Sequence, residues 1–128
     1  MEKPVSEFKS KGGPNRVIEA FVNSIDGLRA AWQHESAFRQ EVVVFIIATV
    51  VALLLPVSAF QKVALISVLL LVLLVEIINS AIEAVVDRIS LDRHHLSKRA
   101  KDMGSAAVAL AITIAVLVWV VVLSNRYY

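Results

Sequence analysis

The sequence predicts an all-α integral membrane protein, with three helices that span the bilayer and an amphipathic helix that lies on its surface. Hydrophobic residues make up 58% of the 128 residues, whereas soluble domains are roughly half apolar. Charged residues are absent from three long stretches, 42–61, 63–75 and 104–125. Apolar residues at helical spacing precede the first of these stretches. The length favours a single domain.

Two segments precede the first apolar stretch. Residues 1–15 are polar around Gly12, Gly13 and Pro14, which predicts a flexible N-terminal tail, and residues 16–128 are predicted to form one membrane domain. Over about 16–34, apolar residues recur at steps of three and four on one helical face. They are Ile18, Phe21, Ile25, Leu28 and Trp32. This pattern predicts a helix lying flat at the membrane surface, and a plain packing helix is the alternative.

The three uncharged stretches predict the spanning helices. A bilayer core needs about 20 mostly apolar residues per helix. The first and third stretches satisfy this alone and predict spans at about 38–55 and 102–123. The middle stretch has only 13 residues, so its helix must continue past Glu76. The second span is therefore predicted at about 63–89.

The distribution of Lys and Arg predicts the orientation. They gather in the N-terminal arm and between the second and third spans, whereas the loop around 56–62 holds only Lys62. The positive-inside rule places the N-terminus and the second loop in the cytoplasm. The net charge of +2 gives no support for nucleic-acid binding. The absence of cysteine excludes disulfides and thiolate metal sites.

One face of the second span is acidic. Glu76, Asn79, Glu83 and Asp87 follow at steps of three, four and four, and so fall within roughly 80° of one another. Carboxylates at membrane depth are rare and normally face a protein interior or a wet cavity. We call these four residues the carboxylate stripe. Polar contacts between helices are the alternative interpretation.

The carboxylates of the stripe could bind a cation or accept a proton. Oxygen ligands suit a hard cation such as Mg²⁺, which takes one or two carboxylates together with phosphate oxygens. A carboxylate in an apolar setting also suits a general base. Because three spans provide little interior, burial of the stripe favours an oligomer.

Basic residues come close to the stripe in the segment "LSKRAKDMGSAA", residues 96–107. Ser97 is predicted to cap the third helix. Lys101 and Asp102 are predicted at the depth of Glu83, where Lys101 could hold a polyphosphate. Glu35, at the mouth of the first span, is a further candidate ligand for the cation. The alternative is that Glu35 is simply a solvated surface residue.

Three strings together resemble the prokaryotic diacylglycerol kinases: "GLRAAWQHESAFRQE", "VEIINSAIEAVVDRIS" and "LSKRAKDMGSAAV". The resemblance extends over about residues 16–119. It implies a multi-pass homotrimer of the bacterial inner membrane, with three spans and a surface helix per chain. It implies transfer of the γ-phosphate of ATP to diacylglycerol at a cytoplasmic site that uses a divalent cation such as Mg²⁺. Membrane lipids would surround the protein.

The resemblance also implies roles for individual residues. Glu76 would be the general base and Asn79 would order it, while Glu35 and Glu83 would hold the metal. Nucleotide contacts are implied for Arg16, Asn23, Glu35, Glu83, Asp92, Arg93, His94, Lys101 and Asp102. The lipid headgroup would lie among Ser24, Arg29, Trp32, Arg39, Gln40, Glu41 and Ser105.

Three alternatives remain open at this stage. An undecaprenol kinase would share these motifs, although the full surface helix and the tail of the third span favour diacylglycerol. A small ion-coupled transporter would also use a Glu within the membrane, but it would not need Lys101 and Asp102 beside it. A purely structural membrane protein is the third.

Overall fold

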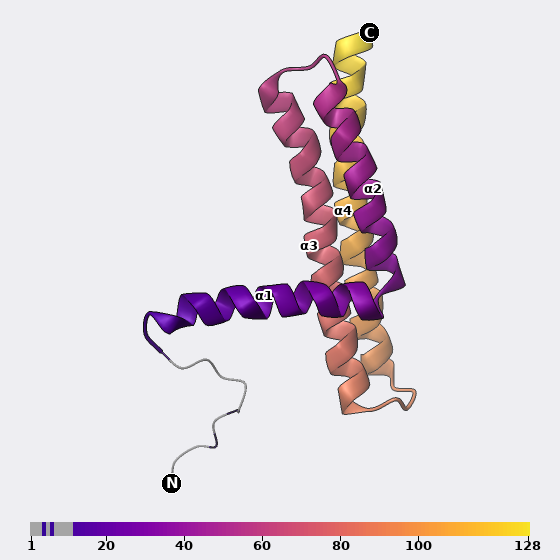
Figure 1. The fold of residues 1–128 in the computed structure, drawn as a ribbon. Helices are drawn as coiled ribbons and strands as arrows, with labels where there is room; N and C mark the ends of the chain where they lie inside the picture. Colours follow the sequence, from indigo (N-terminus) through magenta and orange to yellow (C-terminus); the bar gives the residue numbers. More distant parts are fainter. Residues whose placement is uncertain (1–3, 5, 7–11) are drawn as a thin grey trace.

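The computed structural model describes residues 4, 6 and 12–128, and these contain four helices and no strand. The helices are α1 (Asn15–His34), α2 (Ser36–Leu54), α3 (Ala59–Ile89) and α4 (His95–Tyr127). Helix α3 runs antiparallel to both α2 and α4, and α1 crosses these three helices at a steep angle (Figure 1). The all-α prediction is confirmed. The predicted tail lies mostly outside the described residues.

Three of the helices are long and apolar enough to cross a membrane, as predicted. The 19 residues of α2 span about 28 Å at 1.5 Å per residue, close to the thickness of a bilayer core, about 30 Å. With 31 and 33 residues, α3 and α4 are much longer. Their connected ends continue past the level at which α1 crosses the bundle (Figure 1). We call this projecting part of α3 and α4, with their loop, the hairpin.

The helices extend beyond the predicted spans. Helix α4 begins at His95 rather than near residue 102, and α3 begins at Ala59 rather than near 63. The reason is that the charge pattern marks where a helix leaves the hydrocarbon, whereas backbone hydrogen bonding continues through the polar residues beyond that point. The hairpin is therefore helical almost to its tip.

Helices α3 and α4 each begin with a side-chain cap. A capping box begins α3: Gln61 N donates to Ser58 Oγ at 3.1 Å, and Ser58 N donates to Gln61 Oε1 at 3.0 Å. At the start of α4, Leu96 N donates to His94 Nδ1 at 3.1 Å. The prediction that Ser97 caps this helix is thus wrong, because the helix has already begun two residues earlier.

The longest helix contact joins α3 and α4. Small residues dominate the buried side of α4: Gly104, Ala111, Ala115 and Val122. Small side chains let two membrane helices approach closely. At the end of the bundle away from the hairpin, Ala52, Leu65 and Val122 form a buried apolar cluster. Many other large apolar side chains on the spans are exposed, as expected where lipid or another subunit covers them.

Trp119 connects α4 to α3 within this cluster. Its Nε1–H donates to Leu65 O at 3.3 Å. We expect Trp119→Phe to destabilise the protein by about 1 kcal/mol, the usual net value of one hydrogen bond. Unfolding in mixed micelles would measure this, with Trp32→Phe on exposed α1 as the control. Equal stability of both variants would show that the bond contributes nothing.

Candidate functional site

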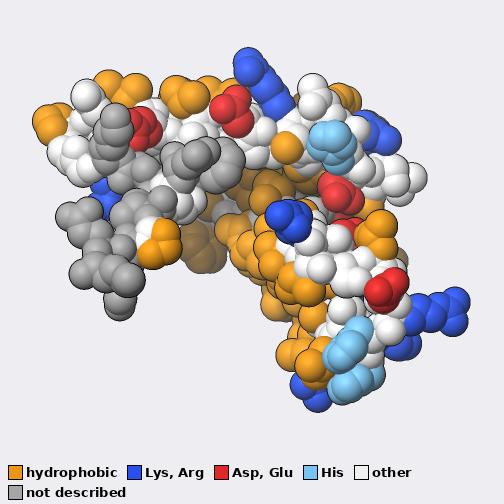
Figure 2. All heavy atoms as spheres, turned by 90° about the horizontal axis from the view of Figure 1, so that it is seen from below, with side chains coloured by type: hydrophobic (Ala, Val, Ile, Leu, Met, Phe, Trp, Pro, Cys, Tyr) orange, Lys and Arg blue, Asp and Glu red, His pale blue; other side chains and the backbone are white. Residues whose placement is uncertain are grey.

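The carboxylate stripe runs from the buried part of α3 into the hairpin. Glu76 is 5% exposed and Asn79 is 8% exposed. Glu83 is half-buried, and the side chain of Asp87 is 49% exposed. The stripe therefore connects an enclosed environment with an open one within three helical turns. Seen from the hairpin end, charged and His side chains gather around this open part (Figure 2).

Other acidic groups surround the buried end of the stripe. The carboxyl group of Glu41, on α2, lies within hydrogen-bonding reach of the carboxyl group of Glu76. Glu35 and Glu83 are close enough to interact electrostatically with Glu76. Glu41 Oε2 is also buried, with no hydrogen-bond partner among the described residues. Carboxylates this close together repel one another unless a proton or a cation is present.

The contact between Glu41 and Glu76 was not predicted from the sequence. Glu41 was expected only in the lipid headgroup set, because the two glutamates are 35 positions apart and no periodicity relates them. The one available signal was that both acidic residues flank long apolar runs.

Asn79 occupies the middle of the stripe and packs against Gly104 of α4. Its Oδ1 is buried and has no hydrogen-bond partner in the part of the chain that the structure describes. A Cβ atom built on Gly104 would overlap this oxygen. The amide of Asn79 is therefore enclosed between the two helices.

The hairpin contains a polar cavity of about 600 Å³. Its lining includes five of the residues predicted to contact nucleotide, namely Asp92, Arg93, His94, Lys101 and Asp102. Lys101 Nζ lies 2.8 Å from Asp87 Oδ1, and Lys98 pairs with Asp102. The structure thus brings together charged groups that could bind an anion such as a polyphosphate.

Two predicted nucleotide residues do not line this cavity. Arg16 and Asn23 are exposed on α1, and Arg16 lies near the end of α1 that points away from the bundle (Figure 1). Arg16 and His34 are 18 positions apart, which is about 27 Å along a helix. Within one chain, the structure does not bring them to the hairpin.

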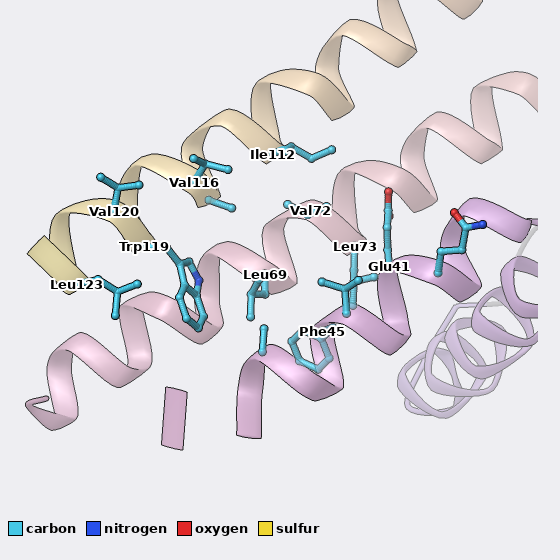
Figure 3. A pocket seen from close by; sticks show the side chains of 14 residues that line it. Glu41, Phe45, Leu69, Val72, Leu73, Ile112, Val116, Trp119, Val120 and Leu123 are labelled. Carbon is cyan, nitrogen blue, oxygen red and sulfur yellow. The ribbon is translucent and has the colours of Figure 1, made fainter. Parts of the chain in front are cut away.

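An apolar groove of about 570 Å³ runs along α2, α3 and α4. Gln40 and Glu41 are its polar residues, and the rest of its lining is almost entirely apolar, including Phe45 and Val116. Figure 3 shows Glu41 at one end of this groove, with apolar side chains along the remainder. The groove thus has the character of a site for a hydrocarbon chain with a polar end.

The remaining headgroup candidates are divided among several places. Arg29 and Trp32 line a second cavity of about 350 Å³ between α1 and α2. Ser24 Oγ donates to Ala20 O at 2.8 Å, so this hydroxyl has a partner within α1. Ser24 and Ser105 are exposed on α1 and α4 and line none of these three cavities.

Arg39 joins α1 to α2 directly. Its Nη1 donates to Trp32 O at 2.7 Å and to Gln33 O at 3.4 Å, two carbonyl groups at the C-terminal end of α1. A cation at that end also complements the helix dipole. In this chain the guanidinium thus links the end of α1 to the start of α2, a contact that the sequence pattern did not indicate.

We expect Arg39→Ala to loosen this junction. Without the guanidinium, the carbonyl groups of Trp32 and Gln33 lose a charge-assisted donor, which is worth about 1.5–3 kcal/mol. Amide hydrogen exchange over residues 28–36 should accelerate about 10-fold or more. Arg29→Ala, on the same surface, is the control. Equal exchange in the two variants would show that Arg39 does not hold the junction.

Comparison with known proteins identifies the family. Residues 22–123 match the family model for prokaryotic diacylglycerol kinase. The chain belongs to the prokaryotic diacylglycerol kinase family. The diacylglycerol kinase of Escherichia coli strain K12 is 55% identical over 115 residues, covering 90% of this chain and 94% of that protein. The diacylglycerol kinase of Pseudomonas aeruginosa is 48% identical over 118 residues, covering 92% and 96%.

More distant members of the diacylglycerol kinase family also match over most of their length. The Haemophilus influenzae diacylglycerol kinase is 41% identical over 107 residues, covering 84% of this chain and 91% of that protein. Family membership confirms the resemblance on which the sequence interpretation relied. It also fits the three apolar helices of a multi-pass membrane kinase.

The described residues of one chain do not by themselves form a complete metal site. Within residues 4, 6 and 12–128, no group of three or more His, Cys, Asp or Glu side chains is arranged to hold a metal ion. Three acidic side chains, Glu35, Glu41 and Glu83, nevertheless lie near Glu76, and Glu41 Oε2 is a buried oxygen with no hydrogen-bond partner among the described residues. This donor set fits Mg²⁺, which typically uses one or two carboxylates and takes its other ligands from water and substrate phosphates.

Proposed function

We propose that this kinase transfers the γ-phosphate of ATP to diacylglycerol, forming phosphatidic acid, at the cytoplasmic face of the bacterial inner membrane. The observation that supports this most strongly is the position of Glu76. It contacts Glu41, which lines the apolar groove, and it shares the carboxylate stripe with Asp87, which lines the polar cavity. A buried base thus lies between a site suited to acyl chains and a site suited to phosphates.

In the proposed reaction, Glu76 accepts the proton of the lipid hydroxyl. The hydroxyl oxygen forms a bond to the γ-phosphorus, the bond from that phosphorus to the β,γ-bridging oxygen breaks, and ADP leaves with the electron pair. Phosphoryl transfer depends mainly on positioning and on neutralising charge. Asn79 would keep the Glu76 carboxylate in place, and Lys101 would pair with phosphate oxygens.

Glu35 and Glu83 would hold the divalent metal ion. When bound, Mg²⁺ neutralises charge on the phosphates of ATP. Lys101 already has Asp87 as a partner at 2.8 Å. Asp87 therefore keeps the ammonium group within the polar cavity when no phosphate is present.

We further propose that the active enzyme is a homotrimer in which subunits share sites. Arg16 and Asn23 lie on α1, whose N-terminal part extends away from the hairpin of its own chain (Figure 1). Exposed apolar residues along α1, including Val17, Ile18 and Phe21, also need lipid or another subunit to cover them. A helix lying in the membrane surface against a neighbouring subunit would cover these apolar residues and could carry Arg16 and Asn23 to that subunit's hairpin.

The proposed function is tested with purified protein in detergent micelles, γ-labelled ATP and either diacylglycerol or undecaprenol. We expect label to enter phosphatidic acid, at least 10-fold faster than the polyprenol phosphate, and to stop when magnesium is removed with EDTA. Preference for the polyprenol would assign the undecaprenol kinase activity instead. Failure to label either lipid would reject both kinase assignments and would favour the small ion-coupled transporter.

Asp87→Asn should raise the KM for ATP by about 10-fold, which corresponds to about 1.4 kcal/mol. The reason is that Lys101 loses the carboxylate that holds it in the cavity. Asp26→Asn, which removes an exposed 3.8 Å ion pair to Arg29, is the matched control and should leave this KM unchanged. Steady-state kinetics measures both. An unaltered KM in Asp87→Asn would show that Asp87 does not position Lys101.

A further inference from the structure

Gly104 has no conformational reason to be glycine. It lies inside α4, and among the described residues only Gly13 has a positive φ. Glycine is the least favourable residue in a helix interior after proline. The backbone of α4 would therefore be better formed with alanine at this position, and a reason must lie in what Gly104 contacts.

The nearest contact is with Asn79. A Cβ atom at position 104 would overlap Asn79 Oδ1 and would lie 3.2 Å from Asn79 Cγ and 3.9 Å from Asn79 Cβ. These are the three nearest heavy atoms, leaving out the adjacent backbone. The obstacle is therefore the amide group of Asn79, and the backbone of α3 is not involved.

Asn79 lies between the two ends of the carboxylate stripe. Glu76 precedes it by three residues and Glu83 follows it by four, so all three project from neighbouring positions of one helical face. With Oδ1 buried and without a partner in the described chain, the amide is located by packing. The open space at Gly104 determines where this packing places it.

We propose that Gly104 is a positioning residue for phosphoryl transfer, which it serves by leaving room on α4 for the Asn79 amide beside Glu76. This inference rests on the proposed function, in which Asn79 orders the general base. A methyl group at position 104 would push the amide away from α4. Substrate binding would be little affected, since ATP and lipid contact other residues.

The test compares Gly104→Ala, Asn79→Ala and the double variant as full-length protein in micelles. Asn79→Ala removes the obstructing oxygen, and its remaining Cβ would be in ordinary contact with the new methyl group, at 3.9 Å. We expect Gly104→Ala to lower kcat at least 10-fold while the KM values for ATP and diacylglycerol change less than threefold. In the Asn79→Ala background, adding Gly104→Ala should leave kcat unchanged within twofold.

Stability provides a readout that does not depend on kinase activity. Gly104→Ala should lower the unfolding midpoint in the native background, because of the overlap, and raise it in the Asn79→Ala background, because alanine favours the helix. Gly27→Ala is the matched control: it replaces a helical glycine with nothing within 4 Å of its Cβ. It should leave kcat unchanged.

Each outcome decides the inference. Independent, multiplying losses of kcat in the double variant would overturn it, as would a Gly104→Ala enzyme with native kcat. If Gly104→Ala fails to fold, recovery of folding in the double variant supports the inference, and no recovery overturns it. A further outcome is that Gly104→Ala shifts the unfolding midpoint in opposite directions in the two backgrounds while Asn79→Ala keeps full kcat. In that case the packing contact is correct and the catalytic positioning is overturned. Absence of kinase activity in the native protein would instead reject the proposed function.

Discussion

Replacing Glu76 with Gln is expected to lower kcat for diacylglycerol phosphorylation by about 10³-fold, within the range typical of a lost general base, 10²–10⁴. Gln has nearly the same shape as Glu, so it preserves packing at a site that is 5% exposed. It cannot accept the hydroxyl proton. Because the residues proposed to bind ATP are untouched, the Kd for Mg·ATP should change less than threefold.

This expectation separates chemistry from folding. Ser80→Ala is the control, since Ser80 is a buried neighbour on α3 whose Oγ has no hydrogen-bond partner among the described residues. It should retain kcat within about threefold, because no proton transfer is assigned to it. Rapid-quench measurement of labelled phosphatidic acid compares the two. Native turnover by the Glu76→Gln enzyme would remove Glu76 from the reaction.

Glu83→Gln is expected to weaken Mg·ATP binding by about 100-fold, or about 2.7 kcal/mol. The amide that replaces the carboxylate has no charge and is a weaker ligand for a hard cation. The loss should depend on the metal, so binding of ATP in EDTA should be similar in the native and variant proteins. Isothermal titration of ATP with and without magnesium measures this difference.

The control for Glu83→Gln is Glu19→Gln, which makes the same change on α1, outside the proposed metal site. It should bind Mg·ATP like the native protein. An equal loss of affinity in EDTA and in magnesium would mean that Glu83 acts on the nucleotide directly or through folding. In that case the metal would have to be held elsewhere.

The sequence was sufficient to predict what depends on local pattern. Uncharged stretches locate α2, α3 and α4, and periodic apolar residues locate α1. The carboxylate stripe was also predictable, because one helix carries it at regular spacing. Helix limits were less accurate: α4 extends to His95 through charged residues, where hydropathy indicates the edge of the membrane and the helix continues.

Contacts between helices could not be predicted from these patterns. Glu41 and Glu76 meet across α2 and α3, and the side chain of Arg39 turns back to the carbonyl groups of α1. Neither contact has a sequence period. Gly104 was recognisable as a small residue that allows close approach, but only the structure shows that Asn79 is what approaches it.

The central claim is that two residues of the carboxylate stripe have different roles. Glu76 is the base that accepts the proton, and Glu83 binds the metal-bound nucleotide. Single-turnover phosphate transfer to diacylglycerol, measured against Mg·ATP concentration in the native, Glu76→Gln and Glu83→Gln enzymes, tests it most directly. We predict that high Mg·ATP restores most of the transfer rate to Glu83→Gln and none to Glu76→Gln. Restoration of Glu76→Gln by Mg·ATP, or native rates in both variants, would contradict the claim.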